Sequence, residues 1–561
     1  MLTPEEILQL LGSLIWLLAG VGVFIVGMNF MSDALEKSAG VGTKKMLEKI
    51  SNNRFSGVGI GAGVTALIQS SSATSVMVIG LVNAGVMTLI QATPIIMGAN
   101  IGTTITGLLV ALKNDYFNML MYLLAFAGVM MSFFKNEKVK IAGTLCCGLG
   151  LIFVGLNIMS SEQAFGNPLV EDLFTQIFKK IDFPLLLILV GVIFTALIQS
   201  SSAATGVVIT MVGTSILPLD LALFIVLGAN IGTCVTALLA AVGASANAKR
   251  VALIHFTFNV IGTALFTAII WIFKEPVVNL LVSMFPNDDP MSLQMRVSIF
   301  HVVFNVTTTC LLLPFVKQLV QYSCAVIKDD KPKEETLTLK FIDDRLLSMP
   351  TVALAQVKKE IHYMYALVEE NMSLAFATVE TGTMQNDEKI KQNEKIINFT
   401  NRALTDFLIK LSADVEQSNE RIIGSYFHVL NDLERIGDHA ENFHEMGVEM
   451  KEKDIVFSGI ARADILEMHG EVTKMFAISK DALESNSKAQ LPVLTKTEKI
   501  VDAMKKDLTA KHFTRLAEGG CKVTASPYYS SLVSGLERVA DHLVNIGYSI
   551  VNPTGSQKVA K

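Results

Sequence analysis

The chain has 561 residues, of which 51% are hydrophobic and 17% charged, and its mean hydropathy is +0.48. It is too apolar to be wholly soluble and too polar to lie wholly within a membrane, so we expect two different parts. The net charge of −5, from 46 basic and 51 acidic residues, argues against a nucleic-acid partner, because Lys and Arg carry most of that contact. The six cysteines form no CxxC pair, which argues against a zinc site or a disulfide scaffold.

The character of the sequence changes near Lys328. Before it, apolar stretches approach the roughly 20 residues that span a bilayer as a helix. After it, charges appear every few positions, hydrophobic residues recur at helical spacing, and no stretch is long enough to cross a membrane. We therefore predict an all-α chain with the following parts: a polytopic membrane domain at 1–328, a linker at 329–348, a soluble helical domain at 349–553 and a flexible tail at 554–561.

The membrane domain contains two kinds of apolar segment. Uninterrupted spans are predicted at about 8–30, 116–134, 141–160, 252–273 and 297–323. The first lacks the basic start of a cleavable signal peptide and is too long for one, so we expect it to remain as an anchor. The other segments carry Gly, Ser, Thr, Asn and Gln in their middle, which lipid-facing helices avoid, and we expect broken or re-entrant helices there. These segments are 57–87, 88–112, 184–217 and 218–242.

An internal repeat runs through the membrane domain. TALIQSSSATSV at 65–76 returns as TALIQSSSAATGV at 195–207, and GANIGTTIT at 98–106 returns as GANIGTCVT at 228–236 with the same offset. FIVGMNFMS at 24–32 also matches FVGLNIMS at 153–160. Duplicated halves with interrupted segments at matching positions are typical of secondary transporters, whose substrate binds at the interruptions near mid-membrane. We place the two repeats at about 8–134 and 141–273, followed by one extra span.

A helix that starts in mid-membrane can bind an anion without a buried Lys or Arg. Its first N–H groups have no partner in the helix, and its dipole end is positive. The hydroxyls of QSSS add donors, whereas Gln and Thr oxygens and freed carbonyls suit a small hard cation. A cation beside a phosphate-sized anion lowers the cost of burying both. The repeated motif therefore indicates a site for an anion and a cation together.

Two motifs in this domain also have a purely structural interpretation. GANIG contains GxxxG, and small residues at this spacing let transmembrane helices pack closely. RVALIHFTFNV at 250–260 resembles RVSIFHVVFNV at 296–306, which gives two equivalent pairs of His and Asn at i and i+4. They are His255 with Asn259 and His301 with Asn305. These pairs suit hydrogen bonds between helices, and a proton pathway is the alternative.

The duplicated QSSS with GANIGT resembles the type II sodium/phosphate cotransporters over residues 1–325. The resemblance implies sodium-coupled movement of inorganic phosphate through two inverted repeats. The phosphate ligands it implies are Ser70, Ser71, Ser72, Ser200, Ser201 and Ser202, with Asn100, Thr103, Asn230 and Thr233 lining the site from neighbouring segments. The sodium ligands it implies are Gln69, Gln199, Thr65 and Thr195.

The soluble domain is duplicated as well. NEKII at 393–397 recurs as TEKIV at 497–501, and LERIGDH at 433–439 recurs as LERVADH at 536–542. Each copy has about three helical stretches, which predicts two tandem three-helix bundles. Carboxylates that converge from facing helices can hold a multivalent metal, and the alternative is a solvated face of salt bridges. The candidate ligands are Glu434, Asp438, Glu537, Asp541, Glu394 and Glu498.

LERIGDH and LERVADH resemble the E-x-x-x-D signature of PhoU-like domains, which are helical phosphate-regulatory modules. With the membrane half, this implies a sodium-coupled phosphate transporter of the cell membrane that works by alternating access and has a cytoplasmic regulatory domain. Sodium would be the coupling ion, and the partners would be phosphate, the lipid bilayer, and a regulatory protein or a second copy of the chain. A proton-coupled or other-oxyanion transporter and a membrane-anchored phosphate sensor are the alternatives. We do not expect an enzyme, because GxxxxGK[ST], HExxH and GxSxG are all missing from the sequence.

Overall fold

The computed structural model describes residues 3–48, 53–112, 115–180, 183–329, 337–348, 350–413, 417–485 and 487–551. These residues form helices and no strand, so the predicted all-α fold is confirmed for them. The chain divides into two compact units, Met1–Pro332 and Lys333–Lys561, which we call the N-terminal and C-terminal units. Residues 330–336 of the expected linker, residue 349 and the expected tail 554–561 lie outside the described residues.

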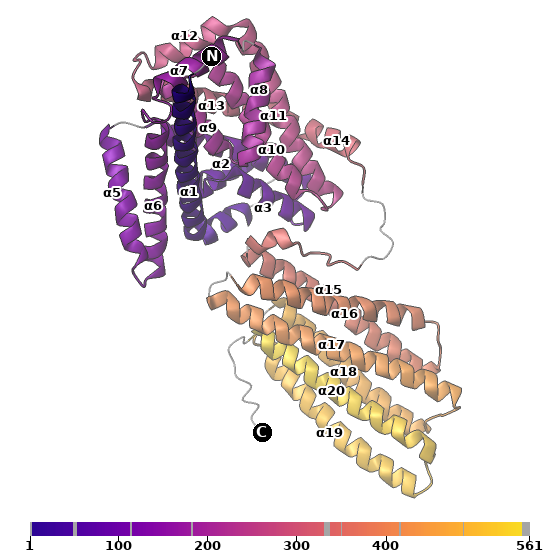
Figure 1. Cartoon of the computed structure of the whole chain (residues 1–561). Coiled ribbons are helices and arrows are strands. Elements are labelled where there is room, and N and C mark those ends of the chain that lie inside the picture. The colour runs from indigo at the N-terminus through magenta and orange to yellow at the C-terminus, as the bar shows by residue number, and fades with distance from the viewer. Residues whose placement is uncertain are drawn as a thin grey trace. The chain divides into compact units, whose positions relative to one another are not determined.

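The N-terminal unit contains long helices that could span a membrane and shorter apolar helices between them (Figure 1). Six stretches in the described residues are long and apolar enough to cross a membrane, and they lie in α1, α4, α6, α10, α11 and the region of α13 and α14. The bounds are α1 (Pro4–Glu48), α2 (Arg54–Ile68), α3 (Ser71–Asn83), α4 (Leu89–Ala111), α5 (Asp115–Ser132), α6 (Glu137–Met159), α7 (Pro168–Lys180), α8 (Pro184–Ile198), α9 (Ser201–Gly213), α10 (Leu219–Ala240), α11 (Ala246–Ile272), α12 (Lys274–Met284), α13 (Pro290–Leu312) and α14 (Val316–Val326).

The helix breaks predicted within 57–87 and 184–217 are confirmed. The breaks predicted within 88–112 and 218–242 are wrong: these segments form the continuous helices α4 and α10, whose small and polar residues are largely buried within the unit. Each QSSS segment lies where one short helix ends and the next begins, at α2–α3 and at α8–α9. The span expected at 297–323 is instead interrupted after Leu312 by a short 3-10 turn, Leu313–Phe315, before α14 begins. Pro314 lies in this turn, and proline removes a backbone donor and clashes with the preceding helical turn.

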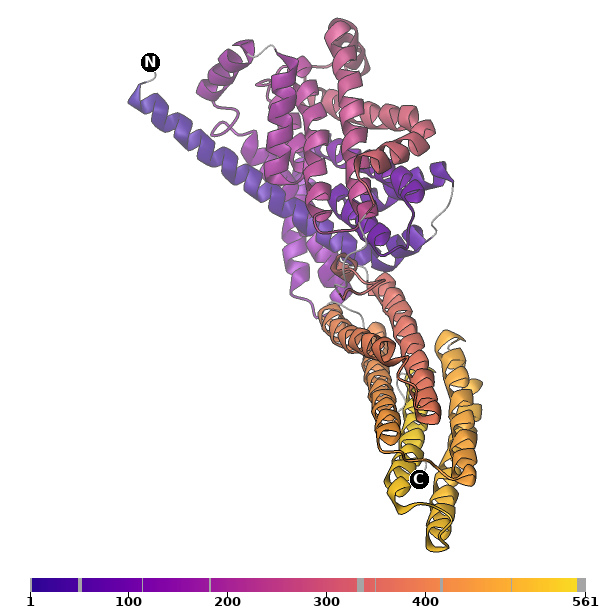
Figure 2. The same cartoon turned by 90° about the vertical axis from the view of Figure 1, so that its right-hand side faces the viewer.

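The matched segments 24–32 and 153–160 lie on α1 and α6, which pack against each other (Figure 1). Gly20 lies against Met159 and Gly27 against Ile152, so the two helices run antiparallel. Figure 2 shows α1 as a long helix that crosses the unit obliquely. Because equivalent segments run in opposite directions, the two repeats are inverted relative to each other.

Glycines bring the first helix of each broken pair into backbone contact with the GANIG helix. A Cβ at Gly98 of α4 would lie closer than 3.0 Å to the carbonyl oxygen of Val58 in α2. In the second repeat, a Cβ at Gly228 of α10 would lie equally close to the carbonyl oxygen of Ile188 in α8. The glycines of GANIG therefore serve helix packing, as the GxxxG interpretation predicts.

The C-terminal unit is two three-helix bundles joined along α17 and α20. Helices α15, α16 and α17 pack on one another, as do α18, α19 and α20, and α17 packs on α20. Large buried side chains fill this unit, among them Tyr365, whose hydroxyl donates to the carbonyl of Phe476 at 2.8 Å. The bounds are α15 (Pro350–Thr381), α16 (Asp387–Ser412), α17 (Gln417–Glu452), α18 (Gly459–Ser485), α19 (Gln490–Ala517) and α20 (Ser526–Val551).

The glycine contacts give a direct test of the packing in the N-terminal unit. We expect Gly98→Ala and Gly228→Ala each to force two helices apart and to destabilise the fold by about 1 to 3 kcal/mol, because each added methyl group meets backbone. Gly59→Ala in α2 is the matched control, since nothing lies within 4 Å of its Cβ position. Melting temperature in detergent is the measurement. Equal melting temperatures for all three variants would contradict the close approach.

Candidate functional site

Both QSSS motifs adopt the same local backbone. Gln69 and Gln199 are left-handed, with φ of 58° and 59°, and the serine that follows each is extended, with φ of −142°. A left-handed backbone is costly for a non-glycine residue, and here it ends one helix and lets the next begin at once. The side chain of Ser70 accepts a hydrogen bond from the amide of Ala73 at 3.1 Å, and that of Ser200 accepts one from Ala203 at 3.2 Å.

The first turns of α3 and α9 contain the serines that were predicted to bind an anion. The amides of Ser71 and Ser72, at the first two positions of α3, have no acceptor in their own helix. Ser201 and Ser202 begin α9 in the same way. Ser71, Ser201 and Ser202 are buried and Ser72 is half-buried. Each helix therefore offers backbone donors and hydroxyls at its positive end.

The two motifs meet through contacts that cross between the repeats. The hydroxyl of Ser72, from the first repeat, lies 3.2 Å from that of Thr236 in α10 of the second repeat. Ser202, from the second repeat, lies 3.4 Å from Thr106 in α4 of the first repeat. Ser72 is equivalent to Ser202 and Thr106 to Thr236, so both repeats contribute to one polar site.

The two glutamines differ in their surroundings. The hydroxyl of Thr106 donates to Oε1 of Gln69 at 2.7 Å, and Nε2 of Gln69 donates to the carbonyl of Ala66 at 2.7 Å. Gln69 is half-buried, whereas Gln199 is exposed. The site is therefore symmetric in backbone but not in the solvent exposure of its two ends.

Thr65 and Thr195 lie buried just before the helix breaks. Thr65 is hydrogen-bonded to Thr74 on the far side of the break at 2.9 Å, which shows that the chain reverses there as a hairpin. Ala204 occupies the equivalent of Thr74 in the second repeat, and Oγ1 of Thr195 has no partner within the described residues. Thr195 thus keeps a buried oxygen available for a ligand.

The four residues expected to line the site from α4 and α10 make their contacts elsewhere. The hydroxyls of Thr103 and Thr233 donate to carbonyls in their own helices, those of Ala99 and Ala229. Asn100 and Asn230 instead face α11 and α13, as described next. The structure does not bring these four side chains into hydrogen bonding with the serine triplets in the part of the chain it describes.

Two histidine–asparagine clusters join the repeats to α11 and α13. Nε2 of His255 in α11 lies 3.4 Å from Oδ1 of Asn100, and Nε2 of His301 in α13 lies 3.3 Å from Oδ1 of Asn230. Asn259 and Asn305 complete the clusters at 3.5 and 3.4 Å from Asn100 and Asn230. These are hydrogen bonds between helices, as one of the two interpretations predicts, and in the described residues both Nδ1 atoms remain without a partner.

In the first bundle of the C-terminal unit, carboxylates gather between α16 and α17. Glu394 is 5% exposed, and its pKa is raised to about 7 by burial and then by Glu441, Asp438 and Glu434. Its Oε1 accepts from Asn398 at 3.0 Å, while its Oε2 has no partner in the described residues. A buried carboxylate among like charges is costly to ionise, and a bound cation would remove that cost.

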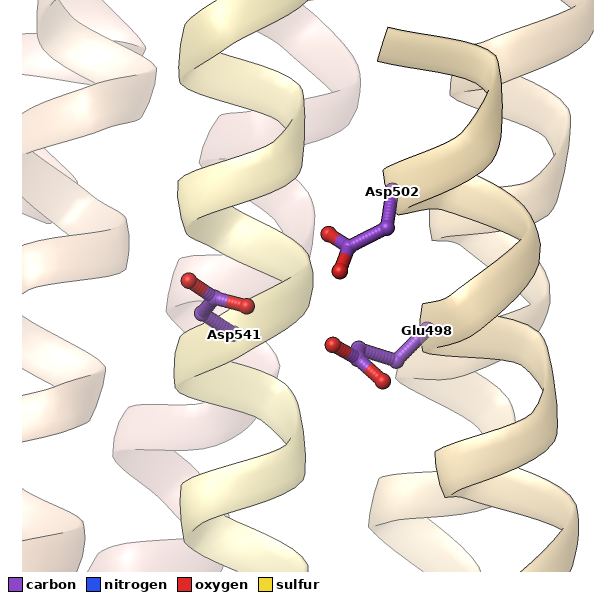
Figure 3. Close-up of side chains that lie close together, drawn as sticks. All are labelled: Glu498, Asp502 and Asp541. Atoms are coloured by element: carbon purple, nitrogen blue, oxygen red, sulfur yellow. The ribbon is translucent and has the colours of Figure 1, made fainter. Parts of the chain in front are cut away.

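The second bundle holds a tighter acidic group. Glu498 and Asp502 of α19 point toward Asp541 of α20, and one oxygen from each lies within 4.8 Å of the others (Figure 3). Burial is the first cause that raises the pKa of Glu498, followed by Asp502 and Asp541. Glu537, also a predicted ligand, instead pairs with Lys505 at 2.9 Å. Of the predicted ligands in this bundle, Glu498 and Asp541 therefore lie close together, whereas Glu537 forms an ion pair with Lys505 instead.

Sequence reasoning missed four residues of these sites. Thr106 and Thr236 end the repeated GANIGTTIT and GANIGTCVT segments, and their position in the repeat was the available signal. Asp502 lies four residues after Glu498, the same spacing that pairs Glu434 with Asp438. Glu441 has no such signal, because Val544 occupies the matching position in the second bundle.

Comparison with known proteins identifies a family for each of the two parts of the chain. The Na⁺/Pi-cotransporter family matches residues 23–161 and 166–280, and the PhoU domain matches residues 361–446 and 465–550. The PhoU matches fall one on each three-helix bundle.

Relatives share this arrangement over different lengths. YjbB of Salmonella typhimurium, named for a proposed role in inorganic phosphate export, is 25% identical over 552 residues, covering 96% of this chain and 97% of its own. The uncharacterised protein YqeW of Bacillus subtilis is 32% identical over 296 residues, which cover 52% of this chain and 91% of YqeW. Human sodium-dependent phosphate transport protein 2B is 25% identical over 406 residues, which cover 46% of this chain and 59% of its own. The chain is thus a membrane protein of the Na⁺/Pi-cotransporter family, a family of phosphate transporters, and carries PhoU domains in its C-terminal part.

Proposed function

We propose that this protein moves inorganic phosphate across the cell membrane in a sodium-coupled cycle of alternating access. The observation that carries the proposal is the crosswise meeting of two broken helix pairs, Ser72 with Thr236 and Ser202 with Thr106. In both contacts, a serine from the first turn of α3 or α9 meets a threonine of the other repeat. A dehydrated oxyanion needs donors of this kind, already in place.

Phosphate would be held by the serine triplets of both repeats. Backbone amides at the starts of α3 and α9 would replace part of its hydration shell, and the hydroxyls would donate further hydrogen bonds. We assign the following residues to phosphate: Ser70, Ser71, Ser72, Ser200, Ser201 and Ser202 directly, Thr106 and Thr236 as additional hydroxyl donors, and Asn100, Thr103, Asn230 and Thr233 as residues that shape the walls.

Sodium would bind beside the phosphate at the glutamines and the buried threonines before the breaks. Gln69 and Gln199 contribute carboxamide oxygens, and Thr65 and Thr195 contribute hydroxyl oxygens. The buried Oγ1 of Thr195, which has no partner in the described residues, supports this role. The name of the human relative, a sodium-dependent phosphate transport protein, also supports sodium as the coupling ion.

Alternating access would exchange the environments of the two repeats. The repeats are inverted, and Gln199 is exposed while the equivalent Gln69 is half-buried and bonded to Thr106. In an inverted pair, the opposite state is reached when the two repeats adopt each other's conformation. Exposure would then pass from Gln199 to Gln69.

The PhoU domains would lie in the cytoplasm and regulate this cycle, alone, with a protein partner or in a homo-oligomer. We assign 1–328 to transport, 329–348 to the linker, 349–553 to regulation and 554–561 to a tail. The apolar spans followed by a charged helical region without a further long apolar stretch support this division.

The direction of phosphate transport and the identity of the coupling ion each have an alternative. YjbB is named for phosphate export, and the same site can run outward when the gradients require it. The unpartnered Nδ1 atoms of His255 and His301, in the described part of the chain, favour protons as the second candidate for the coupling ion.

The proposal predicts phosphate flux driven by a sodium gradient in proteoliposomes containing the full chain. We expect a sodium gradient to accelerate labelled phosphate entry at least tenfold over a potassium gradient of the same size, with reversal of the gradient reversing net flux. A proton gradient alone should give no acceleration. Phosphate flux that is driven by the proton gradient and is independent of sodium would contradict sodium coupling and support proton coupling.

The crosswise threonines predict a second result. Thr106→Val and Thr236→Val keep the side-chain shape but remove a hydroxyl, so we expect each to reduce sodium-driven flux about tenfold or more. Thr210→Val is the matched control, because the hydroxyl of this buried threonine of α9 donates to the carbonyl of Gly206 and to no group of the other repeat among the described residues. Equal flux in all three variants would remove the threonines from the site.

We further propose that the carboxylates of each PhoU bundle bind a multivalent metal. Glu498, Asp502 and Asp541 would hold it in the second bundle, with Glu537 adjacent. Glu394, Glu434, Asp438 and Glu441 would hold it in the first bundle. The like charges that raise the pKa of Glu394 and of Glu498 support this, because a cation would offset their repulsion.

The metal proposal predicts a change in metal content. Asp502→Asn combined with Asp541→Asn should remove about half of the Mn²⁺ or Fe³⁺ retained by the full chain after loading and desalting, measured by mass spectrometry of the metal. Asp507→Asn is the control, since this exposed carboxylate of α19 pairs with Lys511 outside the group. Retention of no metal by the unmodified chain would leave these carboxylates as an acidic surface.

A further inference from the structure

The repeated motif of the PhoU bundles has a basic face that the metal proposal does not use. In LERIGDH and LERVADH, Arg435 and His439 lie at i and i+4, and Arg538 and His542 repeat this spacing. Glu434 and Asp438 act on Glu394 of their own bundle, and Asp541 lies beside Glu498 and Asp502 of its own. The histidines face the other bundle, because the rings of His439 and His542 lie 6.0 Å apart across the contact of α17 with α20.

The two copies of this basic face are not equivalent. Nδ1 of His542 lies 2.8 Å from Oδ1 of Asp432 on α17. The residue equivalent to Asp432 in the second bundle is Gly535, so His439 has no matching carboxylate. Gly535 is required there, because a Cβ would lie closer than 3.0 Å to the ring of Phe443 on α17. Close packing of the two bundles thus leaves His439 without a hydrogen-bond partner in the described residues.

The charges around His439 are mainly positive. Three basic side chains lie near enough to His439 to act on its charge, in the order His542, Arg538 and Arg435. Within the described residues, Arg538 and Arg435 form no ion pair, although Arg435 also acts on the neighbouring Glu434. The positive potential of these basic side chains favours an anion beside them.

A cleft beside this cluster is large enough for a small ligand. It has a volume of about 1010 Å³ and runs between α17 and α20, with His439, Asn442 and Arg538 among its lining residues. The hydroxyls of Ser531 and Ser534 also line it. Its acidic members are Glu445 and Glu449, and Glu449 is paired with Lys453.

We propose that Arg538 and His439, with the hydroxyls of Ser531 and Ser534, form a binding site for inorganic phosphate where the two PhoU bundles meet, and that Arg435 adds positive charge nearby. Guanidinium groups and hydroxyls are donors that match a tetrahedral oxyanion, and a histidine ring can add an N–H. Phosphate would link α17 to α20 and so couple the two bundles. Regulation of transport by the transported phosphate would rest on the proposed function. Phosphate binding at this site would not depend on it.

Hydrogen–deuterium exchange of the full chain in nanodiscs tests this site. Millimolar phosphate should slow exchange in 435–446 and 528–542, and this protection should persist in a Gln69→Ala, Gln199→Ala background that lacks the proposed transport site. His439→Gln combined with Arg538→Gln should raise the phosphate concentration needed for protection about tenfold or more. Arg421→Gln, an exposed arginine of the same α17, is the control and should change nothing.

The outcomes separate the two proposals. Protection that remains in the His439, Arg538 double variant, or that is absent from the unmodified chain, overturns the regulatory site. Equal protection by chloride at the same ionic strength also overturns it, because a general basic surface would then explain the effect. Absence of sodium-driven phosphate flux in the unmodified chain, together with intact protection, would contradict the transport proposal and leave this site in place. Exchange rates without phosphate report whether the variants keep their fold.

Discussion

The architecture depends on a left-handed glutamine held between two helices, once in each repeat. At Gln69 and Gln199 the chain leaves one helix and starts another almost at once, so the amides of the serines that begin α3 and α9 have no acceptor in their own helices. Burial of unpaired donors is costly, and the arrangement persists because helices on both sides are fixed by packing. In the proposed function, a bound oxyanion supplies the acceptor for these donors.

Glycines make that arrangement possible by letting helices touch through their backbones. Gly98 and Gly228 bring α4 and α10 against α2 and α8, which fixes the first helix of each broken pair. Further along α4 and α10, Thr106 and Thr236 contact the serines of the other repeat. Helix packing and polar contacts between the repeats are therefore not competing explanations of the GANIGTTIT and GANIGTCVT segments, since different residues of one segment serve each.

Much of the fold could be predicted from the sequence. The internal duplications revealed the helix breaks at the QSSS motifs, the two three-helix bundles and most of the clustered carboxylates. The contacts between the repeats could not be predicted. Comparison of the repeats aligns Ser72 with Ser202, whereas in the structure Ser72 contacts Thr236. The turn at Pro314 was missed because hydropathy stays high across it. The different surroundings of Gln69 and Gln199 were also out of reach, because identical motifs carry no information about which side of the protein is open.

The two bundles of the C-terminal unit are also nearly equivalent and differ at a critical position. Asp432 of the first bundle corresponds to Gly535 of the second. The central claim remains the shared site formed by the two QSSS turns. Its most direct test is a cryo-electron microscopy map of the full chain in nanodiscs with sodium and phosphate. We predict density for a tetrahedral anion between the starts of α3 and α9, within hydrogen-bonding distance of Ser71 and Ser201. Well-resolved turns with bound phosphate located elsewhere would contradict the account.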